Sequence, residues 1–195
     1  MTYAVPISFA QFWAFSACGI LFFLFLLRAA AGRTAESGTK RDRRSQLGII
    51  IQTIGIAFVG FGPVKPILQP LSPAGICGTA VVLGLMSGTI GLFWRSSREL
   101  GRNWSLVART RADHELIRTG PYSRVRHPIY LAMLLFLLPL AVALGHWLQL
   151  IVAIPLFLLG TKMRTDAEER LLEQSFGETF RQYRKSTPAI FPKVV

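Results

Sequence analysis

The sequence predicts an all-α integral membrane protein with about five transmembrane helices. Of its 195 residues, 51% are hydrophobic and only 16% are charged, whereas a soluble domain usually carries about 25% charged residues. The mean hydropathy is positive, at +0.42. The apolar residues also form long runs instead of alternating with polar ones. Runs of this kind are typical of helices that cross a bilayer.

The first two apolar runs predict the first two membrane helices. Residues 7–31 are long enough to cross a hydrocarbon core of about 30 Å at about 1.5 Å per residue. A cleaved signal peptide is the alternative for this run, but no Lys or Arg precedes it, and a signal peptide needs a basic leading end. The second run covers residues 47–62, and a proline-rich turn follows it over residues 63–73.

The third run covers residues 74–94 and is rich in small residues. We expect its glycines to let neighbouring helices approach closely, and they are Gly78, Gly84, Gly88 and Gly91. The chain's two cysteines, Cys18 and Cys77, lie inside apolar runs. We therefore expect them to be small core residues, and neither a disulfide nor a pair of metal ligands.

The second half of the chain begins with a polar, basic stretch that is unsuited to crossing a membrane. Two short apolar runs follow and predict a helical hairpin over residues 130–163, with a break at Gly145-His146. From residue 164 onward, apolar side chains recur at helical spacing and predict an amphipathic tail that lies on the membrane or covers the site; they are Leu172, Phe176, Phe180 and Tyr183. We thus divide the chain into residues 1–95, with three helices, and residues 96–195.

The basic residues predict how the chain is oriented. The net charge is +12, and every Lys and Arg except Lys65 falls in residues 28–44, 95–126 or 162–195. Five crossings place these three segments on one side, which the positive-inside rule makes cytoplasmic, with the N-terminus outside the cell membrane. Since the charges flank apolar runs, they indicate contact with anionic membrane lipids, and we expect no nucleic-acid partner.

Residues 114–130 hold an unusual density of reactive side chains. Gly120-Pro121 marks a turn, and Pro128 suits the first turn of the following helix, where its missing N–H is not needed. Arg126, His127 and free backbone N–H groups would then gather at a helix N-terminus, which favours a bound anion such as a carboxylate. Alternatively, Arg126 and His127 anchor the helix at the level of the lipid headgroups.

A second polar group follows the last apolar run. Arg164 and Glu168 are four residues apart and share a helix face, and Glu169 comes next. An exposed ion pair is the simple alternative, worth about 0.3 to 0.5 kcal/mol. The order of the two residues, Arg before Glu, is the less favourable one for such a pair.

These groups belong to a longer series of motifs in residues 100–192. The series is Leu100-Gly101-x-Asn103-Trp104-Ser105, Leu116-Ile117-x-x-Gly120-x-Tyr122, Arg126-His127-Pro128-x-Tyr130, Arg164-x-x-x-Glu168-Glu169-x-x-Leu172-x-x-x-Phe176-Gly177, Tyr183 and Phe191-Pro192. In order and spacing it resembles the C-terminal catalytic region of the isoprenylcysteine carboxyl methyltransferase family, within a wider group that includes phospholipid methyltransferases. Two positions depart from that pattern, since Ala132 replaces a frequent glycine and Phe180 a frequent tyrosine.

The resemblance implies a methyltransferase that uses S-adenosylmethionine and a lipid-like or prenylated acceptor, with carboxyl O-methylation of an isoprenylcysteine-type substrate as the expected reaction. It implies a cytoplasmic cofactor pocket formed by the segment before the fourth helix and the C-terminal helical tail. Arg164 would hold the acceptor and form a catalytic pair with Glu168; no metal is expected. The expected cofactor-binding residues are His114, Glu115, Leu116, Ile117, Tyr122, Arg126, His127, Pro128, Ile129, Tyr130, Glu168 and Glu169.

Three alternatives remain open at this point. The first is N-methylation of a phospholipid or small amine, which needs a proton acceptor such as Glu168 or Glu169. The second is a sterol-type membrane reductase, which uses a nicotinamide cofactor and shares an Arg-His-Pro-like motif. The third is a membrane scaffold without catalytic activity, which leaves the clustering of motifs unexplained.

Overall fold

The computed structural model describes residues 4–31, 43–101 and 115–192, and most of these residues are helical. Within these residues the only strand-like pairing is an isolated bridge between Ser8 and Leu68, so the all-α prediction is confirmed. The helices are α1 (Phe9–Ala31), α2 (Arg43–Gly60), α3 (Pro73–Leu100), α4 (Pro128–Leu135), α5 (Leu137–Leu144) and α6 (Leu150–Ser186), with two 3-10 turns, η2 (Gly120–Ser123) and η3 (Trp147–Gln149).

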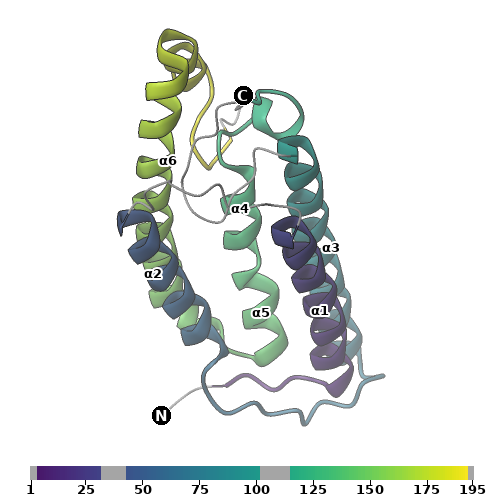
Figure 1. The fold of residues 1–195 in the computed structure, drawn as a ribbon. Coiled ribbons are helices and arrows are strands. Elements are labelled where there is room, and N and C mark those ends of the chain that lie inside the picture. Colours follow the sequence, from purple (N-terminus) through teal and green to yellow (C-terminus); the bar gives the residue numbers. More distant parts are fainter. Residues whose placement is uncertain (1–3, 32–42, 102–114, 193–195) are drawn as a thin grey trace.

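The helices form two pairs on either side of a central column. Figure 1 shows α4 and α5 in line at the centre, the pair of α2 and α6 on one side, and the pair of α1 and α3 on the other. Successive helices run in opposite directions along the bundle, if α4 and α5 are taken together as one column. One end of the molecule therefore holds the ends of α1 and α3, the starts of α2 and α4, and the second half of α6 (Figure 1).

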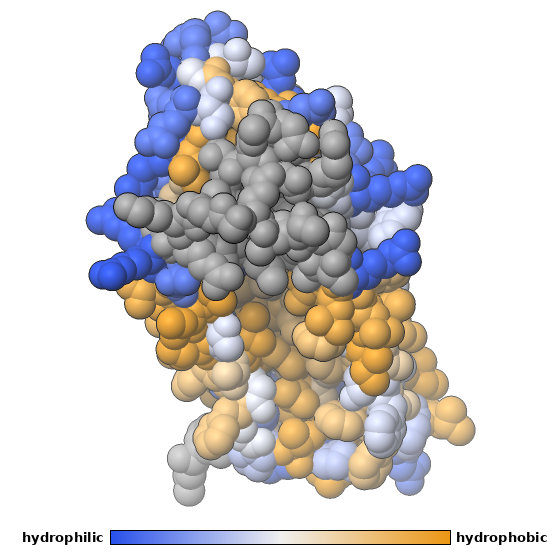
Figure 2. Space-filling model, viewed as in Figure 1, coloured by the Kyte–Doolittle hydropathy of each residue, from blue (hydrophilic) through white to orange (hydrophobic). Residues whose placement is uncertain are grey.

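The surface of this bundle is that of a membrane protein. Of the described helices, three stretches are long and apolar enough to cross a membrane, namely Phe9–Ala29, Pro73–Leu100 and Trp147–Ser186, and Pro128–Leu144 is a shorter apolar helix. Large hydrophobic side chains such as Phe23, Ile54 and Ile151 are exposed. Figure 2 shows these apolar surfaces below a hydrophilic end, which is the end where α3 and α6 finish. Of the five predicted crossings, length and composition thus support three.

The central column consists of two short helices, whose ends are set by Pro139 and Gly145. Pro139 cannot donate a backbone hydrogen bond to residue 135, and α4 ends there. Gly145 ends α5 with φ 73° and ψ 25°, a left-handed conformation that glycine adopts without strain. The predicted break at Gly145-His146 is confirmed. Together α4 and α5 cover about 25 Å at about 1.5 Å per residue.

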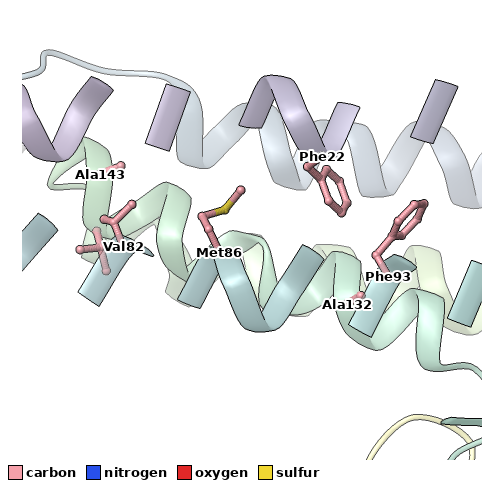
Figure 3. Packing of buried hydrophobic residues seen from close by; sticks show 7 residues of the cluster. Phe22, Val82, Met86, Phe93, Ala132 and Ala143 are labelled. Atoms are coloured by element: carbon pink, nitrogen blue, oxygen red, sulfur yellow. The ribbon is translucent and has the colours of Figure 1, made fainter. Parts of the chain in front are cut away.

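Hydrophobic packing holds the column on both of its faces. One cluster joins it to α1 and α3, where the Phe22 ring lies 4.9 Å from that of Phe93 and 5.1 Å from that of Phe136, between ring centroids. Figure 3 shows this cluster between the helices. A second cluster joins α5 to α2 and α6 through residues such as Val59, Leu140 and Phe157. The start of α4 is therefore fixed relative to both helix pairs.

The C-terminal tail is continuous with the last apolar helix. The predicted tail begins at residue 164, and there α6 passes from its apolar half into its polar half without a break as far as Phe176. Residues 162–176 contain no glycine or proline and many good helix formers, so nothing ends the helix there. Within α6 the backbone leaves helical geometry at Gly177, whose φ is 50° and ψ is −121°, and the helix bends there. Phe180 and Tyr183 beyond this bend are buried, as their spacing predicted.

The packing of small residues corrects two further predictions. A side chain at Gly78 would meet Gln11, but a Cβ atom at Gly84, Gly88 or Gly91 would have no such neighbour within 4 Å, so of these four only Gly78 mediates close packing. Another close helix contact lies between Gly48 of α2 and Gly160 of α6, where an added Cβ atom would meet the backbone of the other helix. Both cysteines are free, but Cys77 is exposed and is not the core residue that was expected.

Candidate functional site

The start of α4 meets the second half of α6 in a group of residues that we name the Arg164 cluster: Gln52, Tyr130, Arg164 and Glu168. The Tyr130 hydroxyl donates a hydrogen bond to the Glu168 carboxylate. The Arg164 guanidinium carbon lies 4.7 Å from the centre of the Tyr130 ring, a cation–π contact. Arg164 Nη1 also donates to Gln52 Oε1 at 2.7 Å. Arg164 is buried, with 5% of its surface exposed, so the two separate sequence motifs meet in one buried polar group.

A second group, the Arg126 cluster, adjoins the first and contains Arg126, His127, Glu169 and Arg184. Arg126 donates to Glu169 Oε1 from Nε at 2.9 Å and from Nη2 at 2.7 Å. His127 Nε2 lies 2.9 Å from the same oxygen, and Arg184 Nε lies 3.5 Å from Glu169 Oε2. Glu169 is thus surrounded by cationic and polar donors. His127 Nδ1 lies 3.6 Å from Glu168 Oε2 and connects the two clusters.

The C-terminal segment after α6 folds back onto residues 126 and 127. The backbone N–H of Arg126 donates to Pro188 O at 2.8 Å, and that of His127 donates to Ala189 O at 2.9 Å. The Arg126 guanidinium also donates to the carbonyl oxygens of Arg184 and Thr187. The groups that were expected to bind an anion at this helix N-terminus therefore hold the C-terminal segment in this structure.

Tyr122 joins η2 to the same region. Its side chain is buried, its hydroxyl donates to Ser96 O at 3.4 Å, and its carbonyl oxygen accepts a hydrogen bond from the Tyr183 hydroxyl at 2.5 Å. Burial raises the pKa of the Tyr122 phenol well above its ordinary value, and the negative charge of Glu168 raises it further. The phenol is therefore a protonated donor at any physiological pH.

The other predicted site residues are spread around these clusters. Pro128 is the first residue of α4, as predicted, and Ile129 packs against the hydrophobic cluster of α1 and α3. Leu116 and Ile117 are partly exposed in the chain before η2, and Glu115 is exposed. His114 lies outside the described residues, as do residues 102–105 of the first motif. The pocket roles expected for all of these residues remain proposals.

Two site residues were missed from the sequence. Gln52 is a polar residue in a largely apolar run, and its burial to 2% exposure could have been suspected from that contrast. Arg184 lies in a basic tail where nothing distinguishes it from its neighbours. Among the described residues, no three His, Cys, Asp or Glu side chains lie close enough together to hold a metal ion.

Fold and site together define an α-helical membrane protein with a buried cluster of Arg, Tyr and Glu where its apolar helices meet its polar end. The chain belongs to the phospholipid methyltransferase family, whose model matches residues 77–179. This family lies within the wider group that the motifs of residues 100–192 resemble, so the predicted membership is confirmed. The matched region includes α4, both clusters apart from Gln52 and Arg184, and most of α6.

Three individual proteins are similar to about half of this chain. A cobalt-zinc-cadmium resistance protein of Cupriavidus metallidurans is 35% identical over 108 residues, and a nickel-cobalt-cadmium resistance protein of Alcaligenes xylosoxydans xylosoxydans is 33% identical over 111 residues. A protein-S-isoprenylcysteine O-methyltransferase of Schizosaccharomyces pombe is 28% identical over 109 residues. Each match covers 54% of this chain, and 49%, 50% and 46% of the three relatives in turn. The chain therefore spans about half the length of these relatives.

Proposed function

We propose that this protein transfers the methyl group of S-adenosylmethionine to a lipid-like acceptor at the membrane, and that the reaction is carboxyl O-methylation of an isoprenylcysteine-type substrate. The observation that carries the proposal is the Arg164 cluster. Arg164 is buried where the apolar half of α6 gives way to its polar half, directly over Tyr130. Family membership and the similarity to the Schizosaccharomyces pombe protein support the reaction class.

The residues around Tyr130 suit the proposed cofactor. When bound, S-adenosylmethionine supplies a methyl group activated on a sulfonium cation, and it also carries an ammonium group. Glu168 offers a carboxylate, and Tyr130 and Tyr122 offer aromatic rings, which are the groups that attract cations. His127 lies edge-on to Tyr130 with ring centroids 5.8 Å apart. We propose that these four residues hold the cofactor, together with His114, Glu115, Leu116, Ile117, Pro128 and Ile129.

Arg126 and Glu169 are better suited to supporting the site than to touching the cofactor. Their side chains bond to each other, and Arg126 also bonds to the C-terminal segment. A buried ion pair of this kind is strongly destabilised when one partner is removed. We therefore refine the role of both residues and propose that they keep the C-terminal segment closed against the start of α4.

Arg164 would act on the acceptor. A carboxylate acceptor is ionised at neutral pH, so its methylation requires alignment and the exclusion of water, and no general base. The Arg164 guanidinium can bind a carboxylate with two parallel hydrogen bonds and so fix its direction. An amine acceptor would instead have to lose a proton, for which Glu168 is the nearest carboxylate to Tyr130.

We also propose that this end of the molecule is cytoplasmic and that the N-terminus lies outside. In support, Arg98 lies in the last turn of α3 and Arg184 in the last turn of α6, and both helices finish at the hydrophilic end of the molecule (Figures 1 and 2), whereas Lys65 lies in the loop between α2 and α3. A water-soluble cofactor would then reach the site from the cytoplasm, and a lipid-borne acceptor from the bilayer.

The test is to incubate the purified protein with S-adenosylmethionine carrying a labelled methyl group and a panel of prenylcysteines, phospholipids and small amines. We expect base-labile label, the mark of a methyl ester, on a prenylated carboxylic acid. Base-stable label on an amine would replace the O-methylation proposal with N-methylation. Label on no member of the panel, together with no binding of S-adenosylhomocysteine, would reject the proposed function.

A further inference from the structure

Gln52 is a polar residue in the middle of α2, outside the region that the family model matches. It faces α6 and is 2% exposed. A buried amide costs free energy unless its donor and acceptor groups are hydrogen-bonded, and more so among apolar helices. The side chain meets this requirement with two partners on α6, since Nε2 donates to Thr161 Oγ1 at 2.7 Å and Oε1 accepts from Arg164 Nη1 at 2.7 Å.

The Thr161 hydroxyl determines the direction of these two hydrogen bonds. The Thr161 hydroxyl has a single proton, and it donates that proton to Phe157 O at 2.8 Å. Its oxygen can therefore only accept from Gln52, which must present its NH₂ group to Thr161. The carbonyl oxygen of the same amide is thereby turned toward Arg164. If the amide rotated by half a turn, its NH₂ group would face the N–H donors of Arg164. The hydrogen bonds to Arg164 and Thr161 would then both be lost.

The helix contact around Gln52 is too close to allow adjustment. A Cβ atom at Gly48 would lie 2.6 Å from Arg164 Cγ, and a Cβ atom at Gly160 would lie 2.8 Å from Gln52 Cγ. Both distances are below those that real Cβ atoms adopt, so glycine at these two positions brings α2 and α6 together. This approach lets the side chain of Gln52 reach a guanidinium that lies over Tyr130.

A purely structural role must be distinguished, because glutamine can also act as a hydrogen bond between membrane helices. Gln11 of α1 is such a case, since it is 5% exposed and its amide donates to the backbone oxygen of Val142 in α5. Gln52 differs in its partner. Its amide oxygen accepts a hydrogen bond from Arg164, which contacts the Tyr130 ring, and the Tyr130 hydroxyl in turn donates to Glu168.

We propose that Gln52 is a positioning residue that orients the Arg164 guanidinium toward the methyl acceptor. The inference rests on the proposed function, because it needs Arg164 to bind the acceptor. It makes α2, which lies outside the matched family region, a functional part of the reactive centre.

The test compares full-length Gln52→Leu, Gln52→Glu and Gln11→Leu with the wild type in lipid nanodiscs. The readouts are the Kd for S-adenosylhomocysteine, the thermal midpoint, and kcat and KM for the best prenylated acid of the panel. A hydrogen bond to a charged group is worth about 1.5 to 3 kcal/mol, so Gln52→Leu should lower kcat/KM by about 10- to 100-fold. Its Kd for S-adenosylhomocysteine should stay that of the wild type.

Gln52→Glu keeps an acceptor for Arg164 and adds a negative charge beside it. We expect it to fold and to bind S-adenosylhomocysteine normally, yet to raise KM for the anionic acceptor about ten-fold through competition for the guanidinium. Gln11→Leu should lower the thermal midpoint and leave KM and kcat unchanged. If Gln52→Leu behaves like Gln11→Leu, or if Gln52→Glu leaves KM unchanged while wild type is active, the positioning role is wrong and the proposed function survives. A wild type that binds no S-adenosylhomocysteine and methylates nothing rejects both.

Discussion

The Arg126 and Arg164 clusters lie side by side, yet they are built differently. In the Arg126 cluster, the charged groups pair with one another. The Glu169 carboxylate accepts a hydrogen bond from Arg126, lies within hydrogen-bond distance of His127, and lies beside Arg184. In the Arg164 cluster, two of the partners of the guanidinium are neutral, namely the Gln52 amide and the Tyr130 ring. The first arrangement suits a structural role, in which the cluster holds the C-terminal segment against the start of α4. The second orients a charge toward the site, which suits the binding of a substrate.

The denser of the two charged motifs is therefore not the one that we propose to bind the substrate. The sequence places Arg126 and His127 in the denser motif, but their backbone N–H groups and the Arg126 guanidinium are directed at the chain's own C-terminal segment. Arg164 stands in a sparser motif and faces Tyr130 from the buried side of α6. Substitutions at the two clusters should therefore affect stability and methyl transfer separately.

The largest expected effect is on stability, in Arg126→Ala. The substitution leaves Glu169 without the partner that makes two of its hydrogen bonds and frees the carbonyl of Thr187. Breaking a buried ion pair costs about 3 kcal/mol or more. We expect a lower thermal midpoint in nanodiscs, with S-adenosylhomocysteine still bound below that midpoint.

Arg170→Ala is the matched control, because Arg170 follows Glu169 in α6, is exposed, and donates to the backbone oxygen of Asp166. It should change stability by less than about 0.5 kcal/mol. A stable Arg126→Ala variant that has lost cofactor binding would show that Arg126 contacts the cofactor, and the distinction between the clusters would fail.

The second effect is on methyl transfer, in Arg164→Ala. Removing the group that aligns the acceptor carboxylate with the methyl carbon should lower the rate of methyl transfer by about 100-fold, the cost of a small misplacement of the reacting atoms. We expect that loss in the labelled-methyl assay, with the Kd for S-adenosylhomocysteine close to that of the wild type. Arg164→Lys keeps the charge but loses the planar fork of donors, and it should recover little of the rate. Loss of cofactor binding with an unchanged rate at saturating cofactor would contradict the assigned role.

A third, smaller effect concerns the bend that returns the C-terminal segment to the Arg126 cluster. Gly177 has φ 50° and ψ −121°, and a side chain there would meet no atom within 4 Å. Gly177→Ala therefore tests the backbone conformation alone, at a cost of about 1 to 3 kcal/mol. We expect a lower thermal midpoint and faster proteolysis after residue 177.

Gly84→Ala provides the control for that substitution. Gly84 is also open to solvent or lipid, but it lies inside α3 with helical geometry, where alanine is favoured over glycine by about 1 kcal/mol. It should be neutral or stabilising. Equal effects at the two positions would mean that the bend at Gly177 contributes nothing.

The smallest expected effect is in Tyr183→Phe, which removes the hydroxyl that donates to Tyr122 O at 2.5 Å. A neutral hydrogen bond contributes about 1 kcal/mol. We expect a small fall in thermal midpoint and unchanged KM for the acceptor, because Tyr183 holds η2 against the C-terminal helix and does not belong to the Arg164 cluster. A change in KM larger than the change in stability would place Tyr183 nearer the chemistry.

The general fold could be predicted because apolar runs and their breaks are local signals. The runs located α1, α3 and the hairpin, and Gly145 and Pro128 fixed a helix end and a helix start by their own backbone preferences. The change from apolar to polar residues near Met163 marks the start of the predicted tail but does not end α6, because composition alone does not end a helix. Only a residue such as Gly177 does so, and it stands fourteen residues later.

The candidate site was predictable in its motifs and not in its contacts. Local spacing brought Arg126 and His127 to the start of α4 and placed Arg164 and Glu168 on one face of α6. Which carboxylate each cation meets depends on how α4 packs against α6, and this is a property of the whole bundle. Gln52 was missed for the same reason, since it joins Arg164 across 112 positions of the sequence.

The central claim is that the polar end of this bundle binds S-adenosylmethionine, and calorimetry on the wild-type protein tests it most directly. S-adenosylhomocysteine and NADPH would each be titrated into the protein in nanodiscs under the same conditions. The account predicts saturable heat with S-adenosylhomocysteine and none with NADPH. Saturable binding of NADPH, with no heat from S-adenosylhomocysteine, would contradict the account and favour a membrane reductase.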